Sequence, residues 1–104
     1  MKLNVYTIFD TATGAHMRPF FLHADAQAAR MFGDICADKE HEVGKHPEDY
    51  SLCRIGVWDD QSAQMTNEGV DVLVTGLECM SAERNNAVGT VDLQQQEKEL
   101  SNGE

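Results

Sequence analysis

Basic residues are scarce in this sequence of 104 residues, which holds eight Lys and Arg against 18 Asp and Glu. The formal net charge is −10, and the eight cations are scattered along the chain without forming a cluster. Affinity for a nucleic-acid backbone comes largely from cations that displace condensed counterions, so this charge opposes direct binding to phosphates. A basic protein partner suits such an acidic chain better.

Three further features are missing. No apolar run approaches the roughly 20 residues that cross a bilayer. No positively charged and apolar leader precedes the first strand pattern, and the eight glycines are isolated, so there is no glycine-rich phosphate loop. We therefore expect neither a membrane span nor a nucleotide loop.

Cysteine is rare as well: Cys36, Cys53 and Cys79 are widely spaced and odd in number, which predicts free thiols in a reducing cytoplasm. Cys36, His41, His46 and Cys53 are possible zinc ligands, but their spacing matches no standard zinc knuckle. Cys53 with His46, or Cys36 with His41, could pair a nucleophile with a base, yet a strand centre in an acidic chain does not favour a thiolate. We expect no metal, no cofactor and no catalytic residue.

The sequence does contain several patterns that are typical of β-strands. The clearest lies in residues 46–60, HPEDYSLCRIGVWDD, where His46-Pro47 and two acids fix a turn and residues 50–58 form an apolar strand. Residues 2–9 predict a central strand covered on both sides, because both alternating faces are apolar. Residues 17–23 predict its returning partner, with Pro19 at the strand start or on a sheet edge.

Two segments of the chain share a loop pattern. In residues 6–14 and again in residues 55–63, an aliphatic residue and an aromatic precede an Asp, and a hydroxyl residue follows three positions later. This predicts one hairpin loop used twice, around a type I turn that Asp10 or Asp59 initiates. Residues 64–66 and 70–77 favour the return of the second hairpin, as one interrupted strand or as two, because residues 67–69 are a turn signal.

One helix is expected, from Ala24 or Asp25 to Ala37. Its apolar residues recur at intervals of three and four and form a stripe that packs on the sheet, namely Ala28, Met31, Phe32, Ile35 and Cys36. Residues 38–49 are typical of a polar loop, and residues 83–104 of a disordered acidic and polar tail with a helical candidate at 92–100. The sequence predicts a single α+β domain at 1–82, a small antiparallel sheet of about four strands in two hairpins with one helix on one face.

Aromatic side chains offer a second kind of binding. Some of the seven could form a stacking platform for single-stranded DNA, although a small core needs most of them. The adjacent Phe20 and Phe21 must point to opposite faces of their strand, so one face could meet a second subunit in a homodimer. The candidate binding residues are Arg18, Phe20, Arg30, His46, Arg54 and Trp58.

Several short motifs carry a family resemblance. They are residues 4–10 with Gly14, Arg18-Pro19-Phe20, Ala29-Arg30-Met31-Phe32, and above all His46-Pro47-Glu48-Asp49-Tyr50 with Gly56 and Trp58-Asp59. Together they resemble the small non-structural protein of gokushovirus-type microviruses, which are single-stranded DNA phages. The likeness covers residues 1–60, and Ser62-Ala63 stands where the resembling sequences tend to have Thr-Gly.

The resemblance implies a non-enzymatic phage protein of the host bacterial cytoplasm that is absent from the virion. It further implies a role in viral DNA replication, favouring single-stranded genome synthesis and packaging. The acidic charge leads us to expect docking on phage or host replication proteins. A single-stranded DNA-binding protein, and an acidic DNA mimic that inhibits a host protein, are the alternatives.

Overall fold

The computed structural model describes residues 1–81 of the chain. Its elements follow one another as β1 (Lys2–Asp10), β2 (Ala15–His16), β3 (Phe20–Leu22), α1 (Asp25–Ala37), α2 (Glu42–Lys45), the 3-10 helix η1 (Pro47–Asp49), β4 (Tyr50–Asp59) and β5 (Gln64–Thr75). Residues 76–81 are helical and follow β5 directly. The tail expected at 83–104 and its helical candidate lie outside the described residues.

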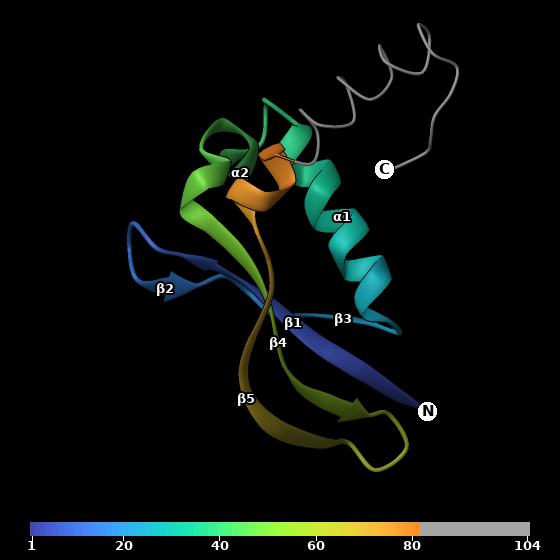
Figure 1. Cartoon of the computed structure of the whole chain (residues 1–104). Coiled ribbons are helices and arrows are strands. Elements are labelled where there is room, and N and C mark those ends of the chain that lie inside the picture. The colour runs from blue at the N-terminus through green and yellow to red at the C-terminus, as the bar shows by residue number, and fades with distance from the viewer. Residues whose placement is uncertain (82–104) are drawn as a thin grey trace, which may run out of the picture.

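One antiparallel sheet contains all the described strands. Its order is β2-β1-β4-β5, with β3 paired beside β2 on the same edge of β1. β1 is therefore central, as expected, and α1 crosses one face of the strongly curled sheet (Figure 1). The predicted α+β fold with a helix on one face of a small antiparallel sheet is confirmed.

The returning strand expected at residues 17–23 is divided into two. β2 and β3 are separated by residues 17–19, where the Met17 N–H still donates to the Ile8 carbonyl at 2.8 Å. Pro19 has no N–H to donate, so the ladder with β1 cannot continue through it. The prediction of one continuous strand was therefore wrong. The interruption lies at Pro19, which the sequence had placed at the strand start or on a sheet edge.

The core lies between α1 and one sheet face, here called the covered face, which carries Tyr6, Ile8, Tyr50 and Leu52. These four side chains are at most 6% exposed. They pack against the expected helix stripe, of which Ala28, Phe32 and Cys36 are buried and Met31 and Ile35 half-buried. The predicted apolar stripe of the helix is thus confirmed, and its most buried positions are one helical turn apart.

Residues 38–49 are more ordered than a polar loop. They contain α2 and η1, and Val43 in α2 is fully buried against the core. The His41 Nδ1 accepts the Val43 N–H at 3.0 Å and caps α2. The loop prediction was wrong because a single buried valine and a histidine cap anchor a segment whose composition is otherwise polar.

The two hairpin loops have the same construction, as their shared pattern predicted. The Gly14 N–H donates to the Asp10 carbonyl and the Ala63 N–H to the Asp59 carbonyl, each at 2.8 Å. Each Asp carboxylate also accepts an N–H two residues later, at 2.9 Å in the first loop and 3.0 Å in the second. The hydrogen bond from the Gln61 N–H is the main cause that lowers the pKa of the Asp59 carboxyl.

Candidate binding groove

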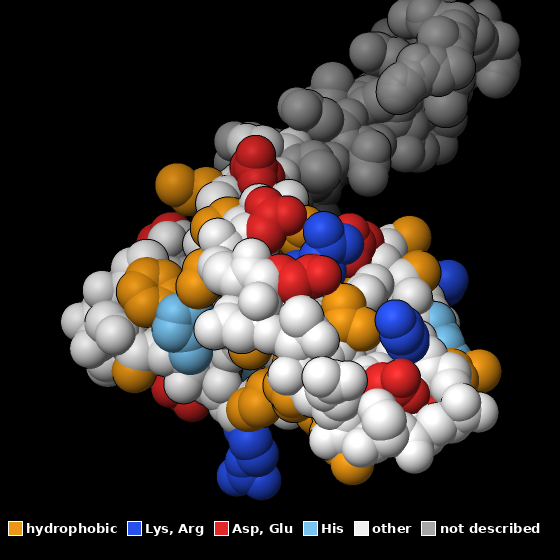
Figure 2. Space-filling view, turned by 90° about the horizontal axis from the view of Figure 1, so that it is seen from below, with side chains coloured by type: hydrophobic (Ala, Val, Ile, Leu, Met, Phe, Trp, Pro, Cys, Tyr) orange, Lys and Arg blue, Asp and Glu red, His pale blue; other side chains and the backbone are white. Residues whose placement is uncertain are grey.

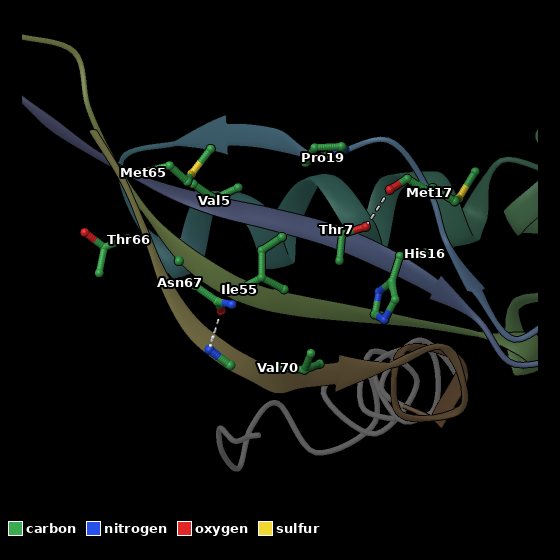
Figure 3. A pocket seen from close by; sticks show the side chains of 12 residues that line it. Val5, Thr7, His16, Met17, Pro19, Ile55, Met65, Thr66, Asn67 and Val70 are labelled. Atoms are coloured by element: carbon green, nitrogen blue, oxygen red, sulfur yellow. Dashed lines mark hydrogen bonds between the residues drawn. The ribbon is translucent and has the colours of Figure 1, made fainter. Parts of the chain in front are cut away.

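A groove of about 520 Å³ lies on the sheet face opposite α1, here called the open face. Its floor is formed by β1 and β4, one wall by β5, and the other wall by β2 and residues 17–19 (Figure 3). The residues that line it are Val5, Thr7, His16, Met17, Pro19, Ile55, Gly56, Met65, Thr66, Asn67, Gly69 and Val70. Figure 3 shows α1 behind the sheet, on the side away from the groove.

Irregular strand pairing creates the hollow. Val5 pairs with Gly56 and Tyr6 with Arg54, so Ile55 is an extra residue in β4. Opposite it, β5 continues from Asn67 to Asp71, so that residues 68–70 form a bulge. Bulges bend a strand and redirect side chains, which explains the curl of β5 and the turn of Ile55 into the groove.

Gly56 allows the two strands to approach at this point. A Cβ there would lie 2.2 Å from the Thr66 carbonyl oxygen, closer than any side-chain carbon can come to the backbone. Gly69, inside the bulge, has a φ of 83°, and its N–H donates to the Asn67 Oδ1 at 2.8 Å. Glycine thus supplies both the close approach and the positive φ that this wall requires.

The floor is fixed rather than loose. Val5 and Thr7 are 1% and 2% exposed, and the Thr7 Oγ1 donates to the Met17 carbonyl at 2.7 Å. That hydrogen bond holds residues 17–19 against β1 and so sets the height of one wall. The groove is therefore largely pre-formed, as binding pockets usually are.

Two aromatic contacts lie on the same face. Phe9 meets His16 with ring centroids 4.6 Å apart, and Phe21 meets Trp58 at 6.1 Å. Register places Phe9 on the face of Val5 and Thr7, while Phe21 pairs with Val5 and Trp58 with Leu3. The open face thus carries an aromatic contact toward each end of β1.

The groove lining has no Asp, Glu, Lys or Arg, although the chain as a whole is strongly acidic. Figure 2 shows hydrophobic side chains reaching the surface at several places in the view from below, with the basic ones few and apart from each other.

Cys53, also on the open face, is 1% exposed, and burial raises the pKa of its thiol, with a further contribution from Asp71. The thiol is thus neutral at neutral pH and poorly suited to nucleophilic attack.

A polar network on the covered face attaches α1 to the sheet. Asp25 in the first turn of α1 accepts the Tyr6 hydroxyl and the Arg54 Nη1, both at 2.8 Å, and Asn4 donates to the Tyr6 oxygen at 3.0 Å. Arg54 also lies 3.8 Å from Asp71 in β5. Burial is the main cause that raises the pKa of Tyr6, opposed by the Asn4 hydrogen bond and supported by Asp25.

The six residues expected to bind a partner lie on different parts of the molecule. Phe20 stacks on Tyr6 at 5.7 Å beside the core, and Arg54 is held by its two carboxylates. Arg30 is exposed on α1, and His46 lies between α2 and η1, 3.7 Å from Glu48. Only Arg18, between Met17 and Pro19, and Trp58 lie next to the groove or on its face.

Sequence reasoning did not identify the residues that line the groove. In the sequence, Ile55 is one more apolar residue of a predicted buried strand. Residues 67–69 were predicted to form a turn, whereas the structure has a bulge there. One signal was present in β5, where Glu68 and Asp71 interrupt a run of apolar residues. A strand buried on both faces would be apolar throughout, so the two acids indicate that the apolar residues beside them are exposed.

Two kinds of site are absent from residues 1–81. No cluster of three or more His, Cys, Asp or Glu side chains in this part of the chain is arranged to hold a metal ion. Among the same residues, no helix has the length and hydrophobicity to span a membrane.

Comparison with known proteins identifies a family for this chain. The family model described as Phage ORF5 protein matches residues 3–79, which include α1, α2 and all the described strands except the first residue of β1. No curated protein and no solved structure matches the chain.

Proposed function

This chain belongs to the Phage ORF5 protein family, and on that premise we propose that it is a non-enzymatic phage accessory protein that binds a partner protein through its open face. The observation that carries the proposal is the groove itself. It is pre-formed, apolar and uncharged in a chain of net charge −10, and it lies beside exposed apolar side chains of β5.

The partner we propose is a phage or host replication protein. The resemblance of residues 1–60 to the small non-structural protein of gokushovirus-type microviruses supports this, as does the acidic charge, which attracts basic proteins. By docking on the replication initiator, the protein would favour single-stranded genome synthesis and packaging. It would act in the host bacterial cytoplasm, outside the virion.

The chemistry of the chain is consistent with recognition rather than turnover. The thiol of Cys53, which pairs with Thr7 of the groove floor, is buried and has a raised pKa. His46, the possible base for this thiol, lies next to Glu48, with 69% of its side chain exposed. A catalytic pair needs hydrogen-bond reach between nucleophile and base, and no such contact joins these two residues in the described structure.

Coexpression with the replication initiator of the same phage, followed by size-exclusion chromatography, tests the proposal. We expect the two proteins to elute together, and Val70→Asp to abolish this because it places a charge in the groove wall. Leu77→Asp is the matched control, since Leu77 is similarly exposed, 59% against 62% for Val70, but lies outside the groove. Failure of the initiator to elute with the unaltered protein, or equal effects of the two substitutions, would contradict the proposal.

Single-stranded DNA is a second candidate ligand because of the two aromatic contacts on the open face. Bases stack on exposed aromatic rings, and Arg18 lies beside the groove. Trp58 is the only tryptophan, so stacking of an oligonucleotide on it should quench the fluorescence of the protein. No quenching and no gel shift at low salt, where phosphate contacts are strongest, would remove this candidate.

A further inference from the structure

The free edge of β5 indicates which kind of partner segment can bind beside the groove. β5 is 12 residues long and forms the outer strand of the sheet, paired on one side with β4. Within residues 1–81, no other backbone segment hydrogen-bonds to it. A strand with an unpaired edge presents N–H and C=O groups at which another extended segment can add.

The two faces of β5 have opposite chemistry. Val72 pairs with Cys53 and Met65 with Trp58, which places both on the open face, and Val70 projects into the groove (Figure 3). These three side chains are 54%, 50% and 62% exposed. Apolar groups of this size beside a free edge are unusual in a strand that meets only water.

The other face of β5 is acidic. Asp71 pairs with Arg54 of the covered face, and Glu68 lines a smaller hollow of about 210 Å³ together with Lys2 and Asp59. β5 itself contains these two acids and no basic residue. A strand added along β5 would therefore meet apolar side chains on one face and carboxylates on the other.

We propose that the partner contributes an extended segment of alternating apolar and basic residues, which adds to the free edge of β5. This rests on the proposed function and names the partner chemistry at the same site. Apolar side chains of the segment enter the groove, and its Lys or Arg side chains approach Glu68 and Asp71. Alternation follows because successive residues of a strand point to opposite faces. A groove of about 520 Å³ has room for the roughly three side chains that six such residues present on one face.

A second copy of this chain fits the same edge less well. Two β5 strands paired about a two-fold axis would bring two acids from each copy along one seam, with no basic residue of β5 to balance them. Each copy also carries a net charge of −10, which opposes association. The same carboxylates that oppose self-pairing favour a basic segment.

The test uses the full chain and a ten-residue peptide of alternating lysine and valine. Hydrogen–deuterium exchange followed by NMR reports which backbone amides become protected. We expect the peptide to slow exchange of the β5 amides that face away from β4, because new inter-strand hydrogen bonds cover them. A peptide with N-methyl groups on alternate amides keeps the charge and the valines but loses those donors, and it should bind at least tenfold more weakly.

Substitutions separate the contributions of charge and of the apolar face. Glu68→Lys should weaken the lysine–valine peptide about fivefold at low salt, and Glu40→Lys, with the same charge change on the turn between α1 and α2, should have little effect. Val70→Thr keeps a β-branched side chain and should also weaken binding severalfold, since it puts a hydroxyl in the groove. A glutamate–valine peptide should not bind.

Three outcomes would overturn the proposal: protection elsewhere than in β5, equal binding of the N-methylated peptide, or self-association of the protein through β5. None of them affects the coexpression test. If the initiator elutes with this protein and Val70→Asp prevents it, while β5 amides gain no protection in that complex, the proposed function stands and strand addition is wrong. If no replication protein binds, the proposed function itself fails.

Discussion

The covered and open faces of the sheet contain similar residues but differ in what lies over them. On the covered face, Tyr6 and Leu52 are fully buried beneath α1. On the open face, the floor of the groove is buried as well, but Met65, Val70 and Val72 of β5 are at least half exposed. Apolar alternation alone does not separate these cases. The difference assigns stability to the covered face and availability for binding to the open face.

The largest expected effect is a loss of stability on the covered face alone. Phe32→Ala should lower the free energy of unfolding by about 3–5 kcal/mol, because it leaves a cavity under a fully buried ring. Val72→Ala removes apolar atoms from the open face and should cost less than about 1 kcal/mol. Urea denaturation followed by circular dichroism measures both. Similar losses for the two variants would mean that the open face is covered in solution.

A methyl group added at Gly56 tests whether the groove depends on the close approach of β4 and β5. Gly56→Ala should destabilise by about 1–3 kcal/mol, since the clash is with a backbone oxygen that cannot move aside. Gly33→Ala is the matched control, because no atom lies within 4 Å of the added carbon on α1. It should stabilise by up to about 1 kcal/mol, since alanine favours the helix more than glycine does. Thermal unfolding of both variants gives the comparison, and a neutral Gly56→Ala would contradict the tight pairing.

A substitution in the second hairpin loop should increase stability without changing either face of the sheet. Ala63 has a φ of 61° where Gly14 has 73° in the equivalent loop, and only glycine adopts this region without steric cost. Ala63→Gly should stabilise by about 0.5–1 kcal/mol, which raises the melting temperature by a few degrees. Gly14→Ala should have the opposite sign. If both substitutions destabilise, the two loops are not equivalent in solution.

Alkaline pH should affect the covered face, which contains both tyrosines. Burial raises the pKa of Tyr6 and of Tyr50 above the ordinary value of 10.0, so unfolded tyrosines ionise first. Their contribution to stability is complete below that pH and is lost as the pH rises through their folded pKa values. Tyr6→Phe should make the fall in stability with rising pH less steep. Urea midpoints at neutral and alkaline pH test this, and an unchanged slope would contradict it.

Local chemistry made much of the fold predictable. The strand at residues 50–58, the helix stripe containing Phe32 and the repeated Asp-initiated loop each depend on residues close in sequence, and all three are confirmed. The short helix α2 was not foreseen, because it depends on burial of Val43 by residues distant along the chain. The division of the returning strand at Pro19 is likewise decided by the β1 ladder.

The candidate site could not be predicted in the same way. Ile55 enters the groove because of a register shift between β1 and β4, and a shift of this kind depends on two strands at once. Six residues were proposed for binding on the basis of charge or ring type. Two of these, Arg54 and Phe20, find partners inside the molecule, because a cation or an aromatic in a small domain is often used by its own core.

The pairing of β1 with β4 affects how the protein can be made. β1 pairs from Asp10 with Tyr50 to Lys2 with Asp59, so β1 joins a strand that is synthesised much later. At ribosomal rates of about 5–20 residues per second, roughly 2–10 seconds separate their emergence from the exit tunnel. β5, which carries the outer edge, emerges after both. A nascent chain therefore has no complete groove to offer a partner until the whole sheet has been translated.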